Sequence, residues 1–94
     1  MSFFYVYLIV SQKKDKIFSY VGYTNDLKKR LNKHNTSKGA KYTKNKFWKI
    51  AYFKKYNTKS RAMKEEYKLK KNYRLRNKIK HKFLHNENIN SSSL

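Results

Sequence analysis

One glutamate lies among apolar residues in the segment between residues 58 and 71. The apolar face of the helix expected there is formed by Ala62, Met63 and Leu69. Glu66 falls inside that face, where a carboxylate is costly unless it is paired or binds a cation. Glu66 is therefore a candidate metal ligand. The structural alternative is an ion pair with Arg30 or Lys70, since salt bridges can imitate active sites.

Arg30 and His34 are one helical turn apart in the segment 25–35 and share a face. His34 lies beside Leu27 and Leu31, and Arg30 lies at the edge of this apolar stripe. The chain has only four arginines but uses lysine freely. A guanidinium is a planar fork that matches phosphate, which suggests that geometry matters at Arg30. Taken alone, His34 on an apolar face is more often a hydrogen-bonded core residue than a catalyst.

The charge of the chain indicates a polyanionic partner. Its 94 residues include 25 Lys and Arg but 5 Asp and Glu, a formal net charge of +20. Such a charge attracts nucleic acid, and we expect DNA ahead of RNA. The alternative is a codon bias that favours lysine and asparagine, although a protein with this charge would bind polyanions in either case. A membrane is not expected as a partner, because no segment combines a basic face with a broad apolar one.

Composition also limits the chemistry and the location. The chain has no cysteine, which excludes disulfides and thiolate metal sites. A site for two metal ions needs a cluster of carboxylates, and the five present are scattered: Asp15, Asp26, Glu65, Glu66 and Glu87. No segment resembles a signal peptide or a membrane span, so we expect a cytoplasmic protein.

The apolar pattern predicts an α/β (α+β) domain at residues 1–85 and a disordered tail at 86–94. The expected strands are 3–10, 18–23 and 47–56, with a polar turn at 11–17 and a core that includes Phe47, Trp48 and Tyr52. The expected helices are 25–35, a second from a cap at Thr58 or Ser60 to residue 71, and a third at 73–84, with a basic loop at 36–46. The order ββαβαα predicts a small three-stranded antiparallel sheet flanked by helices.

Two tripeptides, Tyr5-Val6-Tyr7 and Tyr20-Val21-Gly22, resemble the pair that names the GIY-YIG nucleases. An arginine follows Tyr20 by ten residues, and the segments 37–43 and 60–71 are similar to the small stand-alone branch of that family. The resemblance covers about residues 3–72. The first tripeptide departs from the family pattern, because Tyr5 stands where the family name has glycine.

The resemblance implies a divalent-metal-dependent endonuclease that hydrolyses DNA phosphodiester bonds and selects substrates by their structure. It implies that Glu66 is the only carboxylate ligand of Mg²⁺ or Mn²⁺, that Arg30 holds the scissile phosphate, and that His34 assists proton movement. Tyr7 and Tyr20 would face the phosphate, one as the general base and the other orienting the attacking water; the resemblance leaves open which. An ordinary phenol has a pKa of about 10, and we expect neighbouring cations to lower it.

Further residues are expected to contact the nucleic acid. Gly22 would let its backbone approach the strand closely. The basic candidates are Lys28, Lys38, Lys41, Lys44 and Lys70. Two alternatives stay open beside the enzyme. One is a basic DNA- or RNA-binding module that has the nuclease fold but cuts little or not at all. The other is that Glu66, Arg30 and the tyrosines form only a structural polar cluster, in which case Glu66→Ala should destabilise folding.

Overall fold

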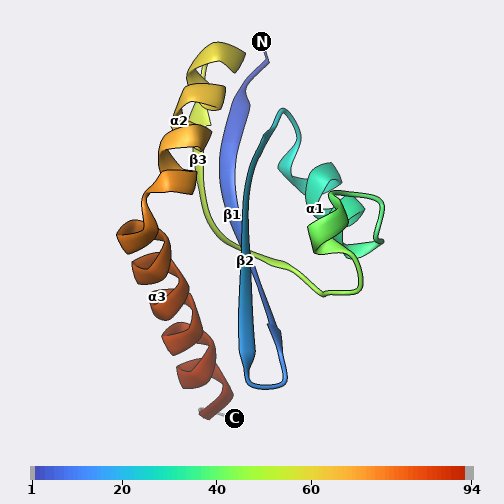
Figure 1. The fold of residues 1–94 in the computed structure, drawn as a ribbon, viewed down its shortest axis with the longest axis vertical. Coiled ribbons are helices and arrows are strands. Elements are labelled where there is room, and N and C mark those ends of the chain that lie inside the picture. The colour runs from blue at the N-terminus through green and yellow to red at the C-terminus, as the bar shows by residue number, and fades with distance from the viewer. Residues whose placement is uncertain (1, 93–94) are drawn as a thin grey trace.

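Three antiparallel strands form the centre of the molecule (Figure 1). The computed structural model describes residues 2–92, with side chains to residue 86. The strands are β1 (Phe4–Lys13), β2 (Lys16–Thr24) and β3 (Lys49–Tyr56), in the sheet order β2-β1-β3. The helices are α1 (Leu27–Asn35), the short 3₁₀ helix η1 (Lys41–Thr43), α2 (Lys59–Lys71) and α3 (Tyr73–Ser92). The predicted fold, ββαβαα with a three-stranded antiparallel sheet, is confirmed.

Helices cover both faces of the sheet, α2 and α3 on one side and α1 on the other (Figure 1). Successive side chains of the central strand β1 point to opposite faces. Val6, Leu8 and Val10 enter a core with Ala62 and Leu69 of α2. On the other face, Tyr7 and Ile9 form a second core with Trp48. Burial on both faces explains why β1 reads as a continuous apolar run rather than as an alternating pattern.

The β1–β2 hairpin is longer than predicted. The segment 11–17 was expected to be a polar turn, but pairing continues to Lys13 and Lys16, and only two residues connect the strands. Lys14 takes up the tight turn with a positive φ of 55°. Gln12 and Lys13 are exposed although they pair with β2. Their polarity therefore marks the solvent-facing end of a strand, not the end of the strand.

Helix α3 continues to Ser92 instead of ending near residue 84. No glycine or proline interrupts it. Of the tail predicted at 86–94, residues 86–92 belong to α3 and residues 93–94 lie outside the described residues. None of the helices within residues 2–92 is long and apolar enough to cross a membrane.

Two predicted core residues, Phe47 and Met63, are exposed. Phe47 precedes β3 and is not paired into the sheet. In α2 the buried side is defined by Ala62 and Leu69, two turns apart. Met63 is rotated by about 100° from Ala62, which is enough to take it off that side.

Candidate active site

A cleft of about 340 Å³ lies along the edge strand β2, where α1 and α2 reach it from the two faces of the sheet. Its lining includes Tyr7, Tyr20, Arg30, Lys59 and Glu66. The structure therefore brings together four of the five residues predicted to be catalytic. The fifth, His34, is hydrogen-bonded to the hydroxyl of Tyr7.

The turn from β2 into α1 places Arg30 beside this cleft. Thr24 Oγ1 accepts a hydrogen bond from the backbone N–H of Asp26 at 3.1 Å. Asp26 is the N-cap of α1, and its Oδ1 accepts a hydrogen bond from the backbone N–H of Lys29 at 3.1 Å. Arg30 consequently lies in the first turn of α1, where the helix dipole also favours an anion.

His34 is buried between two hydroxyl groups. Tyr7 Oη lies 2.9 Å from Nε2, and Thr43 Oγ1 lies 2.9 Å from Nδ1. Thr43 Oγ1 also donates to the carbonyl oxygen of Ala40 at 2.7 Å. Since a hydroxyl has one proton, Thr43 must accept from the Nδ1–H of His34. In the neutral imidazole Nε2 is then the acceptor, and the Tyr7 hydroxyl donates to it.

Burial sets the protonation states of Tyr7 and His34. It raises the pKa of Tyr7 to about 12, although the charge and the hydrogen bond of Arg30 act to lower it. Burial, followed by the charge of Arg30, lowers the pKa of His34. Both groups are therefore neutral near pH 7. Arg30 does lower the pKa of Tyr7, as expected of a neighbouring cation, but the net shift is upward because desolvation of the phenolate outweighs the attraction of Arg30.

The second predicted tyrosine, Tyr20, also contacts His34. The two rings meet edge to face with their centroids 5.2 Å apart. Tyr20 also stacks on Tyr42, with the ring centroids 6.2 Å apart. Within the part of the chain that the structure describes, no hydrogen bond to the Tyr20 hydroxyl is formed. The ring of Tyr20 is thus held in place while its hydroxyl is available to a bound molecule.

The loop after α1 positions Thr43 beside His34. The side chain of Asn35 binds both backbone groups of Trp48, with Oδ1 accepting at 2.6 Å and Nδ2 donating at 3.1 Å. The indole Nε1 of Trp48 donates to the carbonyl oxygen of Thr43 at 3.0 Å. The predicted basic loop therefore contains a folded, partly buried turn. No local signal marks Asn35 or Thr43 in the sequence, because both partners are distant along the chain.

The two glycines of the chain leave space for Tyr7 and His34. A Cβ atom at Gly39 would lie 2.5 Å from His34 Nδ1. A Cβ atom at Gly22 would lie 2.5 Å from Tyr7 Oη and 2.7 Å from Cζ. Neither glycine has a positive φ, so backbone conformation does not require them. Gly22 lines the cleft, as its predicted contact with nucleic acid needs, but the Tyr7 ring takes up the space beside it.

We expect Gly22→Ala to destabilise the fold by about 1–3 kcal/mol, because the methyl group overpacks a site whose tyrosine is buried and hydrogen-bonded. Denaturant unfolding measures this loss, with Ser19→Ala on the same strand as the control. Adding Tyr7→Phe removes the nearest atom, so the double variant should lose less than the sum of the single losses. A Gly22→Ala protein as stable as Ser19→Ala would contradict this explanation.

Glu66 reaches the cleft from α2, with 18% of its side chain exposed. Its Oε1 lies 3.5 Å from Lys70 Nζ, a partly exposed pair of the kind that contributes little to stability. Of the two ion pairs considered from the sequence, the one with Lys70 is present. Among the described residues no ion pair joins Glu66 to Arg30.

The donor set of the cleft fits a hard divalent cation that arrives with a phosphate. Mg²⁺ keeps several waters and is commonly held by one or two carboxylates together with phosphate oxygens. Glu66 supplies one carboxylate beside open space. Arg30 and Lys59 share the cleft and repel a free cation, so tight binding needs the phosphate charge. Within the described residues there is no group of three or more metal-ligating side chains.

The predicted basic contacts are not among the residues that line the cleft. Lys28 on α1 and the loop residues Lys38, Lys41 and Lys44 are exposed, and Lys70 pairs with Glu66. The lysine in the lining is Lys59, which was not predicted. Lys59 is the first residue of α2, and its position in the cleft depends on how α2 crosses the sheet.

Comparison with known proteins gives one family match. The family model described as the GIY-YIG catalytic domain matches residues 3–80. A UPF0213 protein of Oceanobacillus iheyensis is 45% identical over 67 residues, which cover 70% of this chain and 74% of that protein. A UPF0213 protein of Streptococcus agalactiae is 52% identical over 48 residues, covering 50% of this chain and 54% of that protein. No solved structure gives a significant match.

Proposed function

Because this chain belongs to the GIY-YIG family of catalytic domains, we propose that it is a divalent-metal-dependent endonuclease that hydrolyses phosphodiester bonds in DNA. The observation that carries the proposal is the meeting of Glu66, Arg30 and Tyr20 in one cleft, with the hydrogen-bonded Tyr7–His34 pair behind them. Carboxylate, guanidinium and a proton acceptor are the three groups that phosphodiester hydrolysis with one metal requires.

The direction of the Tyr7–His34 hydrogen bond favours Tyr7 as the general base. A water that attacks phosphorus can give a proton to Tyr7 Oη while the phenol proton moves to His34 Nε2. The new bond to phosphorus forms as the bond to the leaving oxygen breaks. With a pKa raised to about 12, Tyr7 is not a phenolate at neutral pH. It does not have to be one, because His34 takes up the phenol proton during the reaction. Tyr20, which lines the cleft, orients the water.

Arg30 has two tasks in this proposal. Its guanidinium hydrogen-bonds Tyr7 and favours the phenolate form. Its position in the cleft also allows it to bind phosphate oxygens as charge builds up on them. Lys59 also lines the cleft and adds positive charge there. When bound to Glu66, Mg²⁺ or Mn²⁺ supplies further neutralisation of the phosphate and of the leaving oxygen.

A panel of labelled substrates tests the proposal: duplex, nicked, flapped, branched and single-stranded DNA, and RNA, each with Mg²⁺, Mn²⁺ or EDTA. We expect cleavage of DNA that needs the metal and stops in EDTA. Salt-sensitive binding without cutting in any metal would support the alternative, a binding module with the nuclease fold.

The pH dependence of stability provides a check on His34. Because its folded pKa lies below the ordinary value of 6.5, the unfolded chain takes up the proton more readily. The contribution of neutral His34 to the free energy of unfolding is therefore complete above pH 6.5 and is lost as the pH falls towards the folded pKa. We expect the free energy of unfolding to decrease in this window, and less so in His34→Gln. His81→Gln is the control, because His81 is an exposed histidine on α3. This variant should keep the wild-type dependence of stability on pH.

Cleavage should decline in the same acid window, since a protonated Nε2 cannot accept the Tyr7 proton. A cleavage rate that stays level as the pH falls well below 6.5 would exclude His34 as the acceptor.

A further inference from the structure

Helix α1 leaves part of its own side of the sheet uncovered. It packs over Ile9 and Ile50, towards the middle of the strands. Beyond it, near the start of β1, the side chain of Phe53 is 54% exposed. Phe53 is paired with Tyr7 in the register of β1 and β3, so it lies on the same face as the tyrosine of the cleft.

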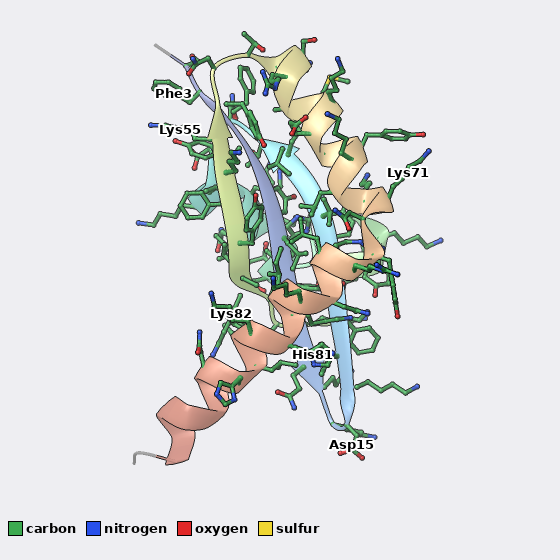
Figure 2. The ribbon with its side chains drawn as sticks, turned by 90° about the vertical axis from the view of Figure 1, so that its left-hand side faces the viewer. Phe3, Asp15, Lys55, Lys71, His81 and Lys82 are labelled. Carbon is green, nitrogen blue, oxygen red and sulfur yellow. The ribbon has the colours of Figure 1, made fainter. Side chains whose placement is uncertain are left out.

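Aromatic and basic side chains gather at this place. Tyr5 meets Phe53 edge to face, with ring centroids 6.2 Å apart. Lys55, which is paired with Tyr5, lies with Nζ 4.3 Å from the ring centroid of Phe3. Figure 2 shows Phe3 and Lys55 together near the N-terminal end of the sheet, across the view from Lys71 of α2. We call Phe3, Tyr5, Phe53 and Lys55 the aromatic patch.

The aromatic patch coincides with the departure from the family tripeptide. Tyr5 stands where the name of the family has glycine, and its ring is the one that contacts Phe53. A glycine there would remove half of that ring pair. The departure therefore adds an aromatic surface beside the cleft without altering Tyr7.

We propose that the aromatic patch stacks unpaired bases of a single-stranded DNA segment, and that the enzyme prefers substrates with such a segment next to the scissile bond. This inference rests on the proposed function. Exposed aromatic rings combined with basic side chains are the means by which proteins bind single strands without reading their sequence. A Lys beside the rings supplies the contact to the phosphate backbone.

Position and distance favour a substrate that spans the patch and the cleft. β3 and β2 flank β1, so two strand spacings separate Phe53 from the cleft along β2, roughly 10 Å. A single DNA strand advances several ångströms per nucleotide, so a few nucleotides bridge that distance. An unpaired base at the patch and a phosphate in the cleft can therefore belong to the same strand.

Charge favours nucleic acid over a protein strand as the occupant. Two consecutive lysines, Lys54 and Lys55, lie on the edge strand β3, and lysines at an edge disfavour pairing with another chain. The sequence from residue 27 to residue 64 contains no Asp or Glu, so no carboxylate of this segment repels a phosphate.

Binding measured in EDTA tests the patch without cleavage. We expect Phe53→Ala to weaken binding of labelled oligothymidine about tenfold, within the range of base stacking on an aromatic side chain. Binding of a blunt duplex should change by less than about twofold. The matched control is Tyr67→Ala on α2, which is 59% exposed and has Lys71 at 4.3 Å from its ring. This control should leave both affinities unchanged. Equal losses in the two variants, or equal losses for single strand and duplex, would overturn the proposal.

A second variant follows stacking directly. The native Trp48 is buried, so an exposed tryptophan at position 53 gives a distinct signal. In Phe53→Trp, saturating oligothymidine should retain binding and quench the emission, and the duplex should not quench it. In Tyr67→Trp neither oligothymidine nor the duplex should quench the tryptophan emission. If the emission of Phe53→Trp is not quenched at saturation, the proposal is overturned. If the protein binds oligouridine more tightly than oligothymidine, and Phe53→Ala loses the same factor in affinity for both, the assignment to DNA is overturned.

The outcomes separate this inference from the function on which it rests. If Phe53→Ala loses single-strand binding but no metal supports cleavage, the nuclease proposal fails and the patch stands. If cleavage is metal-dependent and Phe53→Ala binds and cuts flapped DNA like Tyr67→Ala, the patch fails and the nuclease proposal stands.

Discussion

Glu66→Gln is expected to reduce DNA cleavage by about a thousandfold or more, and to leave DNA binding within about threefold of wild type. The amide keeps the shape of the side chain but removes the only carboxylate in the cleft lining. A neutral amide oxygen is a much weaker ligand for Mg²⁺ or Mn²⁺ than a carboxylate. Single-turnover cleavage and binding in EDTA, measured side by side, give the two quantities.

Glu65→Gln is the matched control on the same helix. Glu65 is paired with Lys68 at 3.3 Å and Glu66 with Lys70 at 3.5 Å, and their side chains are 23% and 18% exposed. Glu65 lines a different depression, beside Val6 and Tyr52, so its replacement should not affect cleavage. Both variants lose one partly exposed ion pair, which costs at most about 1 kcal/mol.

The unfolding free energies of Glu66→Gln and Glu65→Gln decide whether Glu66, Arg30 and the tyrosines form only a structural cluster. If Glu66 had a structural role alone, Glu66→Gln would lose several kcal/mol of stability relative to Glu65→Gln. Loss of cleavage with equal stability in the two variants would leave the catalytic role as the explanation.

Arg30→Lys is expected to reduce cleavage by about a hundredfold, although the positive charge is retained. Lysine cannot form the guanidinium fork, so one side chain no longer reaches both the Tyr7 hydroxyl and a phosphate. Loss of the hydrogen bond from Arg30 should also raise the pKa of Tyr7 further, because that bond opposes the effect of burial. The rate at saturating DNA should therefore fall more than the affinity does.

Arg61→Lys is the control for Arg30→Lys. Arg61 is exposed on α2 beside Lys54 and Lys64, outside the candidate site, and its guanidinium lies over the ring of Tyr56. The same substitution there should change cleavage by less than about threefold. Equal effects at both positions would mean that Arg30 contributes general charge and not geometry.

Apolar patterns along the chain determined the elements and their order. The run through β1 and the stripe with Leu27 and Leu31 each depend on neighbours within one strand or one turn. The sequence left the cap of α2 open between Thr58 and Ser60, and in the structure it is Thr58. Where an element ended was less certain from the sequence. Polar residues continue the β1–β2 hairpin beyond the core, and α3 continues past residue 84, because pairing and helix formation do not require burial at the ends.

The sequence also indicated Glu66, Arg30 and His34 as candidates, since a carboxylate, an arginine and a histidine on or beside apolar faces are locally unusual. Their meeting with Tyr7 and Tyr20 followed from the spacing of the family motif, not from any local signal. The structure places these side chains around one cleft and its buried wall.

The tertiary structure alone decided how protons are held in the site. Tyr7 and His34 are 27 residues apart, and the bond between them depends on α1 crossing the sheet. Thr43 fixes the tautomer of His34 through a loop that Asn35 and Trp48 close. Arg30 lowers the pKa of Tyr7 as expected of a cation, but the net shift is upward. Positive residues are visible in a sequence, whereas desolvation depends on what covers the hydroxyl once the chain has folded.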